Sequence, residues 1–128
     1  MSVPVPAPIH VLVVDDDPVV RRLVAVILSE EGYVVRTASN GAEALDVAGH
    51  SEGTAPDVIV LDLEMPEVDG RACYRALRAR GCLAPVLVLS AYGAHQARRE
   101  LGADAALDKP FDPFELLRRL ERLAPSQP

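Results

Sequence analysis

Five polar or charged side chains of this sequence stand where short apolar runs end. They are Asp15 and Asp16 after the first run, Asp62 after the third, Ser90 after the fourth and Lys109 after a weaker fifth. If the fold gathers them, the three carboxylates would raise one another's pKa, and one lysine would compensate only part of their charge. A divalent cation is the natural source of the rest. Hard carboxylate oxygens that are open to water suit Mg²⁺ better than zinc or a transition metal.

Such a set of groups is suited to phosphoryl transfer, in which a protein mainly positions the reactants and neutralises charge on the phosphoryl oxygens. Asp62 is the best candidate for the nucleophile because it follows the run that should form a rigid central strand. Each residue alone also has a structural interpretation, as a strand-end acid, a turn hydroxyl or a surface lysine. Asp17 is better explained as a helix cap. The coincidence at all the strand ends favours the functional interpretation.

The elements that must position these residues follow from hydrophobic patterning. Apolar residues fill every position of the runs 11–14, 58–61 and 86–89, which is typical of parallel strands buried on both faces. Amphipathic segments alternate with these runs, so we predict an α/β fold, a single doubly wound (βα)5 flavodoxin-like domain with a five-stranded parallel sheet. In such a sheet, ligands bind outside the carboxyl ends of the strands.

Weaker signals complete the predicted architecture. Further strands are expected at 33–38 and 105–107. Helices should begin at Pro18, at Gly41 and after the cap Asp112, and two more should cover 70 to about 80 and roughly 95–101. In the helix from 70 to about 80, the residues expected to face inward are Ala72, Cys73, Ala76 and Leu77. We place the domain at 9–124, with tails at 1–8 and 125–128.

Composition narrows the class of protein. The chain has 128 residues, 49% of them hydrophobic and 25% charged, which fits one globular domain. Its net charge of −6 disfavours direct nucleic acid binding. The apolar runs are too short to span a membrane, and the start is unlike a signal peptide, so we expect a cytoplasmic protein. Cys73 and Cys82 should stay reduced. The histidines, His10, His50 and His95, have no carboxylate or cysteine partner at ligand spacing in the sequence and should be surface residues.

Four segments together resemble those of response-regulator receiver domains. They are VLVVDDDP (11–18), DVIVLDLEMPEVDG (57–70), VLVLSA (86–91) and LDKPF (107–111). The resemblance implies that Asp62 is the phospho-acceptor and that Mg²⁺ is bound by Asp16 directly and by Asp15 through water. It also implies that the backbone carbonyl of Glu64 is a further metal ligand.

The same resemblance assigns the remaining roles. Ser90 and Lys109 would each bind a phosphoryl oxygen after transfer, and the bond before Pro110 is expected to be cis. The partners implied are a sensor histidine kinase or phosphotransfer protein and a downstream protein target, with a homodimer left open. The domain would catalyse its own phosphorylation and dephosphorylation without turning over an external substrate.

Two departures from the family pattern bear on the mechanism. Most receivers carry an aromatic residue three positions before the lysine, where this sequence has Ala106. Tyr92 could replace part of that function by shielding the phosphoryl group, and Glu64 and Tyr92 occupy positions that tune the access of water. The stretch from Ser90 to Gly102 is also shorter than usual by about three residues, close to one helical turn. We therefore expect a short fourth helix and an altered partner face.

These departures leave alternatives open. One is a binding module with the receiver fold whose output does not depend on phosphorylation. Another is an aspartyl-phosphate hydrolase, for which Glu64 would be the second acid, although a chain of this length offers no cap domain.

Overall fold

The computed structural model describes residues 8–49, 55–65 and 69–125. The two predicted tails therefore lie almost entirely outside the described residues, and His50 lies outside them as well. No helix among the described residues is long and apolar enough to cross a membrane.

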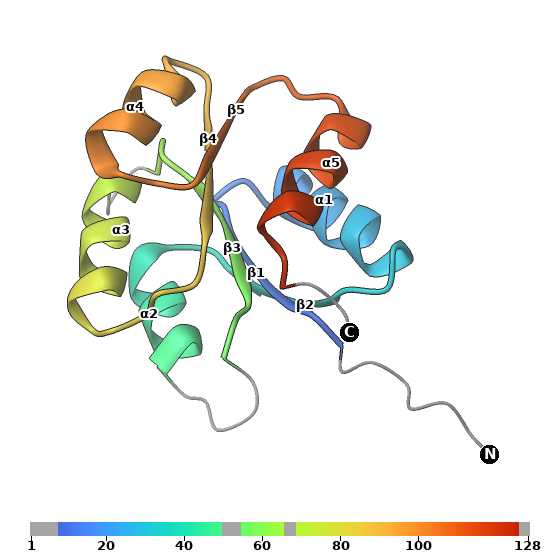
Figure 1. The fold of residues 1–128 in the computed structure, drawn as a ribbon, viewed down its shortest axis with the longest axis horizontal. Helices are drawn as coiled ribbons and strands as arrows, with labels where there is room; N and C mark the ends of the chain where they lie inside the picture. Colours follow the sequence, from blue (N-terminus) through green and yellow to red (C-terminus); the bar gives the residue numbers. More distant parts are fainter. Residues whose placement is uncertain (1–7, 50–54, 66–68, 126–128) are drawn as a thin grey trace.

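Five strands and five helices alternate along the chain, and all strand pairs are parallel. The sheet order is β2-β1-β3-β4-β5, which confirms the predicted doubly wound fold (Figure 1). The elements are β1 (His10–Val14), α1 (Pro18–Glu30), β2 (Val34–Ala38), α2 (Gly41–Gly49), β3 (Val58–Asp62), α3 (Gly70–Ala79), β4 (Val86–Ser90), α4 (Ala94–Leu101), β5 (Ala105–Asp108) and α5 (Pro113–Leu123).

Helices cover both faces of the sheet. Helices α1 and α5 lie on one face, and α2, α3 and α4 lie on the other (Figure 1). Each face has its own hydrophobic cluster, so successive residues of a central strand contribute to opposite clusters. Every residue of β3 and β4 is buried, which explains why their apolar runs are uninterrupted.

The strand register brings the candidate site residues to one edge. Asp62 at the end of β3 pairs with Leu89, and Ser90 at the end of β4 pairs with Asp108. Val14, which ends β1, pairs with Leu61 directly before Asp62. The carboxyl ends of β1, β3, β4 and β5 therefore lie next to one another, as the rule for parallel sheets predicts.

The helices that follow these strand ends start differently. Asp17 caps α1 by accepting hydrogen bonds from the backbone N–H groups of Val19 and Val20, which confirms its predicted role. Asp69 and Asp112 cap α3 and α5 in the same manner. Helix α4 follows Gly93, which has φ of 72° and provides no side-chain cap. It has eight residues, so the predicted short fourth helix is confirmed, with its start at Ala94.

The inward face of α3 differs from the prediction. Ala72 is exposed, and Tyr74 is buried in its place with 6% of its surface exposed. The guanidinium of Arg78 lies 4.8 Å from the centroid of the Tyr74 ring and also donates to the carbonyls of Cys82 and Ala84. This contact fixes a large ring against the core, where it buries more apolar surface than an alanine methyl group would.

His95 and the two cysteines differ in their surroundings. His95 is exposed, as predicted, and its Nε2 also lies 3.8 Å from Oδ2 of Asp108. The prediction missed this pair because the two residues come together only when α4 packs beside β5. Cys73 and Cys82 are free thiols, as predicted, and burial raises the pKa of Cys73 to about 11.

Candidate functional site

Asp62 occupies the centre of the site. Its side chain is buried at the end of β3, between β1 and β4, with only 1% of its surface exposed. Its Oδ1 accepts a hydrogen bond from the backbone N–H of Glu64 at 3.1 Å and lies 3.1 Å from Nζ of Lys109. These two donors come from opposite sides and hold the carboxylate in one orientation.

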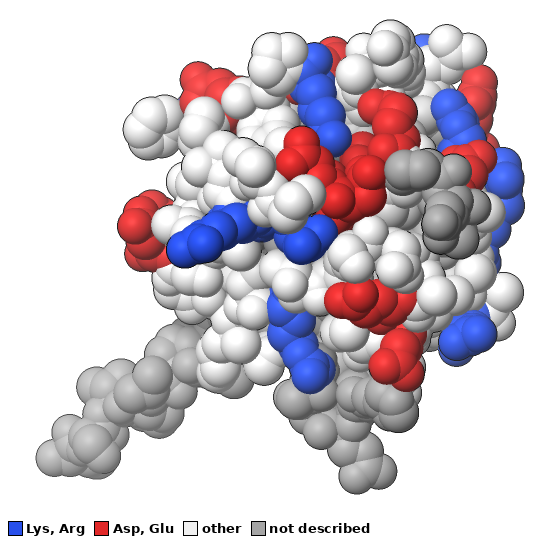
Figure 2. All heavy atoms as spheres, turned by 180° about the vertical axis from the view of Figure 1, so that it is seen from behind, with Lys and Arg blue, Asp and Glu red and all other residues white. Residues whose placement is uncertain are grey.

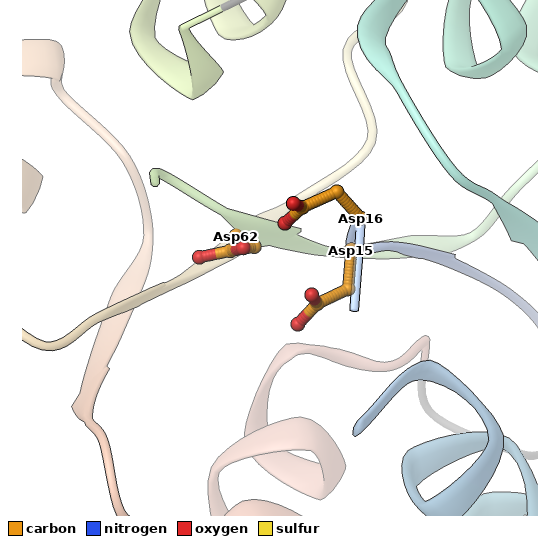
Figure 3. Close-up of side chains that lie close together, drawn as sticks. All are labelled: Asp15, Asp16 and Asp62. Atoms are coloured by element: carbon orange, nitrogen blue, oxygen red, sulfur yellow. The ribbon is translucent and has the colours of Figure 1, made fainter. Parts of the chain in front are cut away.

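Two more carboxylates face Asp62 from the end of β1. One oxygen each of Asp15, Asp16 and Asp62 lie within 4.8 Å of one another (Figure 3). Asp15 is as buried as Asp62, whereas Asp16 is partly exposed. Lys109 bridges Asp15 and Asp62, because its Nζ lies 3.4 Å from Oδ2 of Asp15 and 3.1 Å from Oδ1 of Asp62. The predicted convergence of these four residues is therefore present.

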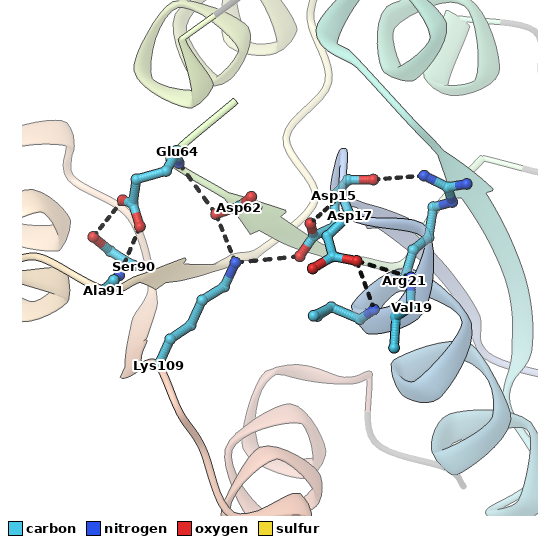
Figure 4. A network of polar contacts seen from close by, with 10 residues as sticks. Asp15, Asp17, Val19, Arg21, Asp62, Glu64, Ser90, Ala91 and Lys109 are labelled. Carbon is cyan, nitrogen blue, oxygen red and sulfur yellow. Dashed lines mark hydrogen bonds and ion pairs between the residues drawn. The ribbon is translucent and has the colours of Figure 1, made fainter. Parts of the chain in front are cut away.

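Backbone contacts hold the first loop of the site in place. The N–H of Asp17 donates to Oδ1 of Asp15 at 2.9 Å, and the N–H of Asp15 donates to the carbonyl of Ala38 on β2. Arg21 of α1 donates to the backbone carbonyl of Asp15 at 2.9 Å (Figure 4). Arg21 was not among the predicted site residues, although its position one turn into the helix after an acidic loop was a usable signal.

The charges of the site shift two pKa values. Burial and the charge of Asp15 raise the pKa of Asp62, and the hydrogen bonds from Lys109 and Glu64 only partly offset these effects, so the resulting pKa is about 6. For Lys109, burial lowers the pKa, but the hydrogen bond and charge of Asp62 and the charge of Asp15 give a net increase. Lys109 therefore stays charged, and the site still contains more negative charge than this lysine balances.

This excess charge and the chemistry of the donors fit a metal ion. The three carboxylates provide oxygen ligands close enough to share one ion. A cation there would offset the repulsion that raises the pKa of Asp62. The acidic triad can therefore bind a metal.

The wider surface shows the same balance of charge. Acidic side chains gather in a cluster on the face drawn in Figure 2, with basic side chains on either side of it.

Ser90 is at the predicted edge, but its hydroxyl is engaged with Glu64. Its Oγ donates to Oε2 of Glu64 at 2.6 Å, and the backbone N–H of Ala91 donates to Oε1 of the same carboxylate at 2.6 Å (Figure 4). The predicted roles of Glu64 were a backbone carbonyl that binds metal and an effect on water, and they did not include this side-chain contact. The adjacency of β3 and β4 was the available signal.

The residues expected to modulate the site lie at its margin. Tyr92 is 81% exposed, so its ring does not cover Asp62 in this structure. Ala106 is fully buried on β5 opposite Val88 and packs into the cluster beneath α4. The peptide bond between Lys109 and Pro110 is cis.

Gly70 fixes the distance between α3 and the end of β3. A Cβ atom at this position would lie 2.4 Å from the carbonyl oxygen of Asp62 and 2.6 Å from Cα of Leu63. Both are backbone atoms and cannot move aside cheaply. A glycine is therefore required where α3 begins beside Asp62.

Comparison with known proteins agrees with this geometry. A model of the response regulator receiver domain matches residues 11–121. The response regulator MprA of Mycobacterium sp. (strain KMS) is 43% identical over 119 residues, which cover 91% of this chain and 50% of that protein. The alkaline phosphatase synthesis transcriptional regulatory protein SphR of Synechococcus elongatus is 39% identical over 123 residues, which cover 89% of this chain and 48% of that protein. The chain thus spans about half the length of these curated relatives.

Solved structures show the same fold. The chemotaxis protein CheY4 of Vibrio cholerae superposes with a TM-score of 0.80 at 34% identity, covering 91% of this chain and 99% of that one. The response regulator TrrA of Thermotoga maritima, solved in complex with Mg²⁺ and BeF, superposes with a TM-score of 0.78 at 33% identity, covering 90% and 98%. Fold, acidic site and relatives agree: the chain belongs to the response regulator receiver domain family of two-component signal transduction, whose members are signalling modules rather than enzymes that turn over a substrate.

Proposed function

We propose that Asp62 accepts a phosphoryl group and that the acyl phosphate switches a protein-interaction surface of the domain. The single observation that carries this proposal is the position of the buried Asp62 carboxylate, 3.1 Å from the Lys109 ammonium and within 4.8 Å of oxygens of Asp15 and Asp16. No structural role requires two buried acids and a lysine to share one edge of the sheet. Leaving such charges buried is costly unless the site uses them.

The metal of this site is proposed to be Mg²⁺, held by Asp15, Asp16 and Asp62 and by the backbone carbonyl of Glu64. Oxygen donors and the partial exposure of Asp16 leave room for water ligands, which Mg²⁺ retains. When bound, the ion would neutralise charge on the phosphoryl oxygens during transfer. The Mg²⁺–BeF complex of TrrA supports this choice of metal.

The residues of the chain would act by positioning. Glu64 N–H and Lys109 hold Oδ1 of Asp62, so the carboxylate is oriented before a phosphodonor arrives. A carboxylate oxygen attacks phosphorus, the bond from phosphorus to the imidazole nitrogen of the donor breaks, and the electron pair of that bond stays on the imidazole. Lys109 and Ser90 would each contact a phosphoryl oxygen of the product.

The partner that delivers the phosphoryl group is proposed to be a sensor histidine kinase or a phosphotransfer protein that docks beside α1. Val19, Leu23 and Val26 on this helix are 74%, 51% and 47% exposed. The helix begins directly after the acidic loop, so a partner covering this face would place its phosphohistidine at Asp62. Large exposed apolar side chains next to a reactive site are typical of protein docking surfaces.

The output is proposed to be a contact with another protein in the cytoplasm, and not direct binding to nucleic acid. The net charge of −6 supports this proposal. The acyl phosphate carries about two negative charges where the carboxylate carried one, and this change at the edge of the sheet can bias the loop before α4.

The test is incubation with Mg²⁺ and a small phosphodonor, followed by intact mass measurement. We expect the mass of one phosphoryl group to be added to the wild-type chain and none to Asp62→Asn. Chelation of the metal should abolish the gain. Phosphotransfer from a panel of histidine kinases would then identify the partner.

The rival functions predict other results. A phosphorylation-independent binding module would gain no mass and would bind its partner equally well as Asp62→Asn. A hydrolase would turn over a phosphomonoester many times per molecule. Either outcome would contradict the proposal.

A further inference from the structure

The side-chain carboxylate of Glu64 accepts hydrogen bonds from two donors, one at the end of β4 and one in the loop between β4 and α4. Ser90 Oγ donates to Oε2 and Ala91 N–H donates to Oε1, both at 2.6 Å. Ser90 is 1% exposed, so its hydroxyl is fixed in place, and the carboxylate comes from a neighbouring strand end, 26 residues away in sequence. One carboxylate is thus held by two converging donors.

This donor pair is built to bind an anion with two adjacent oxygens. A hydroxyl and a backbone N–H that converge on a carboxylate can equally donate to two oxygens of a phosphoryl group, since both anions accept short, charge-assisted hydrogen bonds. The Ser90 hydroxyl is the one that the proposed mechanism assigns to the phosphoryl group. Without a phosphoryl group on Asp62, the same donors therefore bind the carboxylate of Glu64.

We infer that Glu64 is an internal competitor for the phosphoryl site: its carboxylate holds Ser90 and Ala91 until the phosphoryl group on Asp62 displaces it. This inference rests on the proposed phosphorylation of Asp62 and adds the residue that sets how readily the site is filled. Glu64 and the phosphoryl group cannot use the same two donors together, and their negative charges repel each other. Displacement of Glu64 is then part of the switch.

The same residue connects the nucleophile to the loop. The backbone N–H of Glu64 donates to Asp62 while its side chain reaches Ser90 and Ala91. When the carboxylate leaves, Ser90 Oγ still has the carbonyl of Tyr92 at 3.1 Å, but the Ala91 N–H needs a new acceptor, which a phosphoryl oxygen supplies. The acceptor for the loop that leads into α4 thereby changes from the Glu64 carboxylate to the phosphoryl group on Asp62.

The contact with Ala91 can be observed without any phosphodonor or metal. In the amide proton spectrum of the metal-free wild type, Ala91 should appear downfield because its N–H donates to a carboxylate. Glu64→Ala should move this signal upfield, and addition of Mg²⁺ with beryllofluoride should move it downfield again in the variant and keep it downfield in wild type. An Ala91 signal that is the same in wild type and Glu64→Ala would overturn the inference.

Affinity for beryllofluoride at saturating Mg²⁺ measures the competition itself. We expect Glu64→Ala to bind it roughly threefold to tenfold more tightly than wild type, because the ligand no longer displaces a partly exposed charged hydrogen-bond partner. Glu64→Asp is the matched control, since it keeps the charge but is one methylene shorter. It should bind more tightly than wild type if contact matters, and like wild type if only charge matters, which would contradict the inference.

A double-mutant comparison identifies the contact partner. In a Ser90→Ala background, the gain from Glu64→Ala should shrink, because one of the two shared donors is gone. An unchanged gain would show that Glu64 acts without Ser90. If wild type is phosphorylated on Asp62 but Glu64→Ala is indistinguishable from it, the competition is wrong and the proposed function stands. If Asp62 is never phosphorylated in any variant, both fail.

Discussion

Helices α1 and α4 both begin at loops that carry site residues, but they begin in opposite ways. Asp17 caps α1 through two backbone N–H groups, Pro18 occupies its first turn, and Arg21 ties it back to Asp15. Helix α4 is shorter, starts after Gly93 in a left-handed conformation and lacks a side-chain cap. The acidic half of the site is therefore anchored by its own helix cap, whereas the half that carries Ser90 depends on side chains of other elements, Glu64 on Ser90 and Ala91 and Asp108 on the N–H of Ala94. Chemistry needs fixed groups, whereas a switch needs a segment that can change its contacts.

The largest effect on stability is expected from a substitution at Gly70, in the anchored half of the site. Gly70→Ala should lower the free energy of unfolding by about 3 kcal/mol or more, because the added Cβ collides with the backbone of Asp62 and Leu63. Urea denaturation measures this loss. Gly49→Ala is the matched control, since nothing lies within 4 Å of its Cβ position and its φ is not positive. Equal stability of the two variants would mean that α3 does not press on the nucleophile.

The second effect concerns charge in the anchored half. The pKa of Asp62 is about 6 in the folded chain, against an ordinary value of 3.8. Between these values the folded state retains a proton that the unfolded state has lost, so the stability contributed by this group falls as pH rises from about 4 to 6. Without metal, Asp62→Asn should therefore be more stable than wild type by about 2 kcal/mol at pH 7.5, and by little at pH 4.

Denaturation at the two pH values, with and without Mg²⁺, checks this prediction. Saturating Mg²⁺ should stabilise wild type and leave Asp62→Asn nearly unchanged, which removes or reverses the difference. A stability difference that is independent of pH would show that the surroundings of Asp62 do not raise its pKa.

The smallest effect sharpens the contrast between the helix starts. Asp17→Ala should cost about 1 kcal/mol, because two N–H groups of the first turn lose their acceptor. Hydrogen exchange should then show the first turn of α1 opening nearly as readily as that of α4, which is expected to exchange fast in wild type. Asp112→Ala removes the corresponding cap of α5 and should leave α1 protected. Slow exchange in wild-type α4 would contradict the comparison.

The sequence was sufficient for the parts of this molecule that follow from local rules. Uninterrupted apolar runs indicate parallel strands, and parallel strands bring Asp15, Asp62 and Lys109 to one edge, where the structure has them. The caps Asp17 and Asp112 were also predictable, because capping depends on residues two or three positions away.

What could not be predicted depends on contacts between distant segments. Helical spacing alone allowed Ala72 to face inward, but Tyr74 is buried because Arg78 pairs with its ring. The contact of Glu64 with Ser90 and Ala91 joins two loops across the sheet, and its geometry depends on how far each strand extends beyond its last pair. A pattern of residue types does not contain that distance.

The complete burial of β3 has a consequence for the evolution of such domains. The reactive carboxylate is attached to the innermost strand, and the neighbouring strands and helices separate it from most of the outer surface. Mutations on the outside can therefore change which partners are recognised without rebuilding the reaction centre. A domain organised in this manner can diversify its signalling connections while its chemistry is inherited intact.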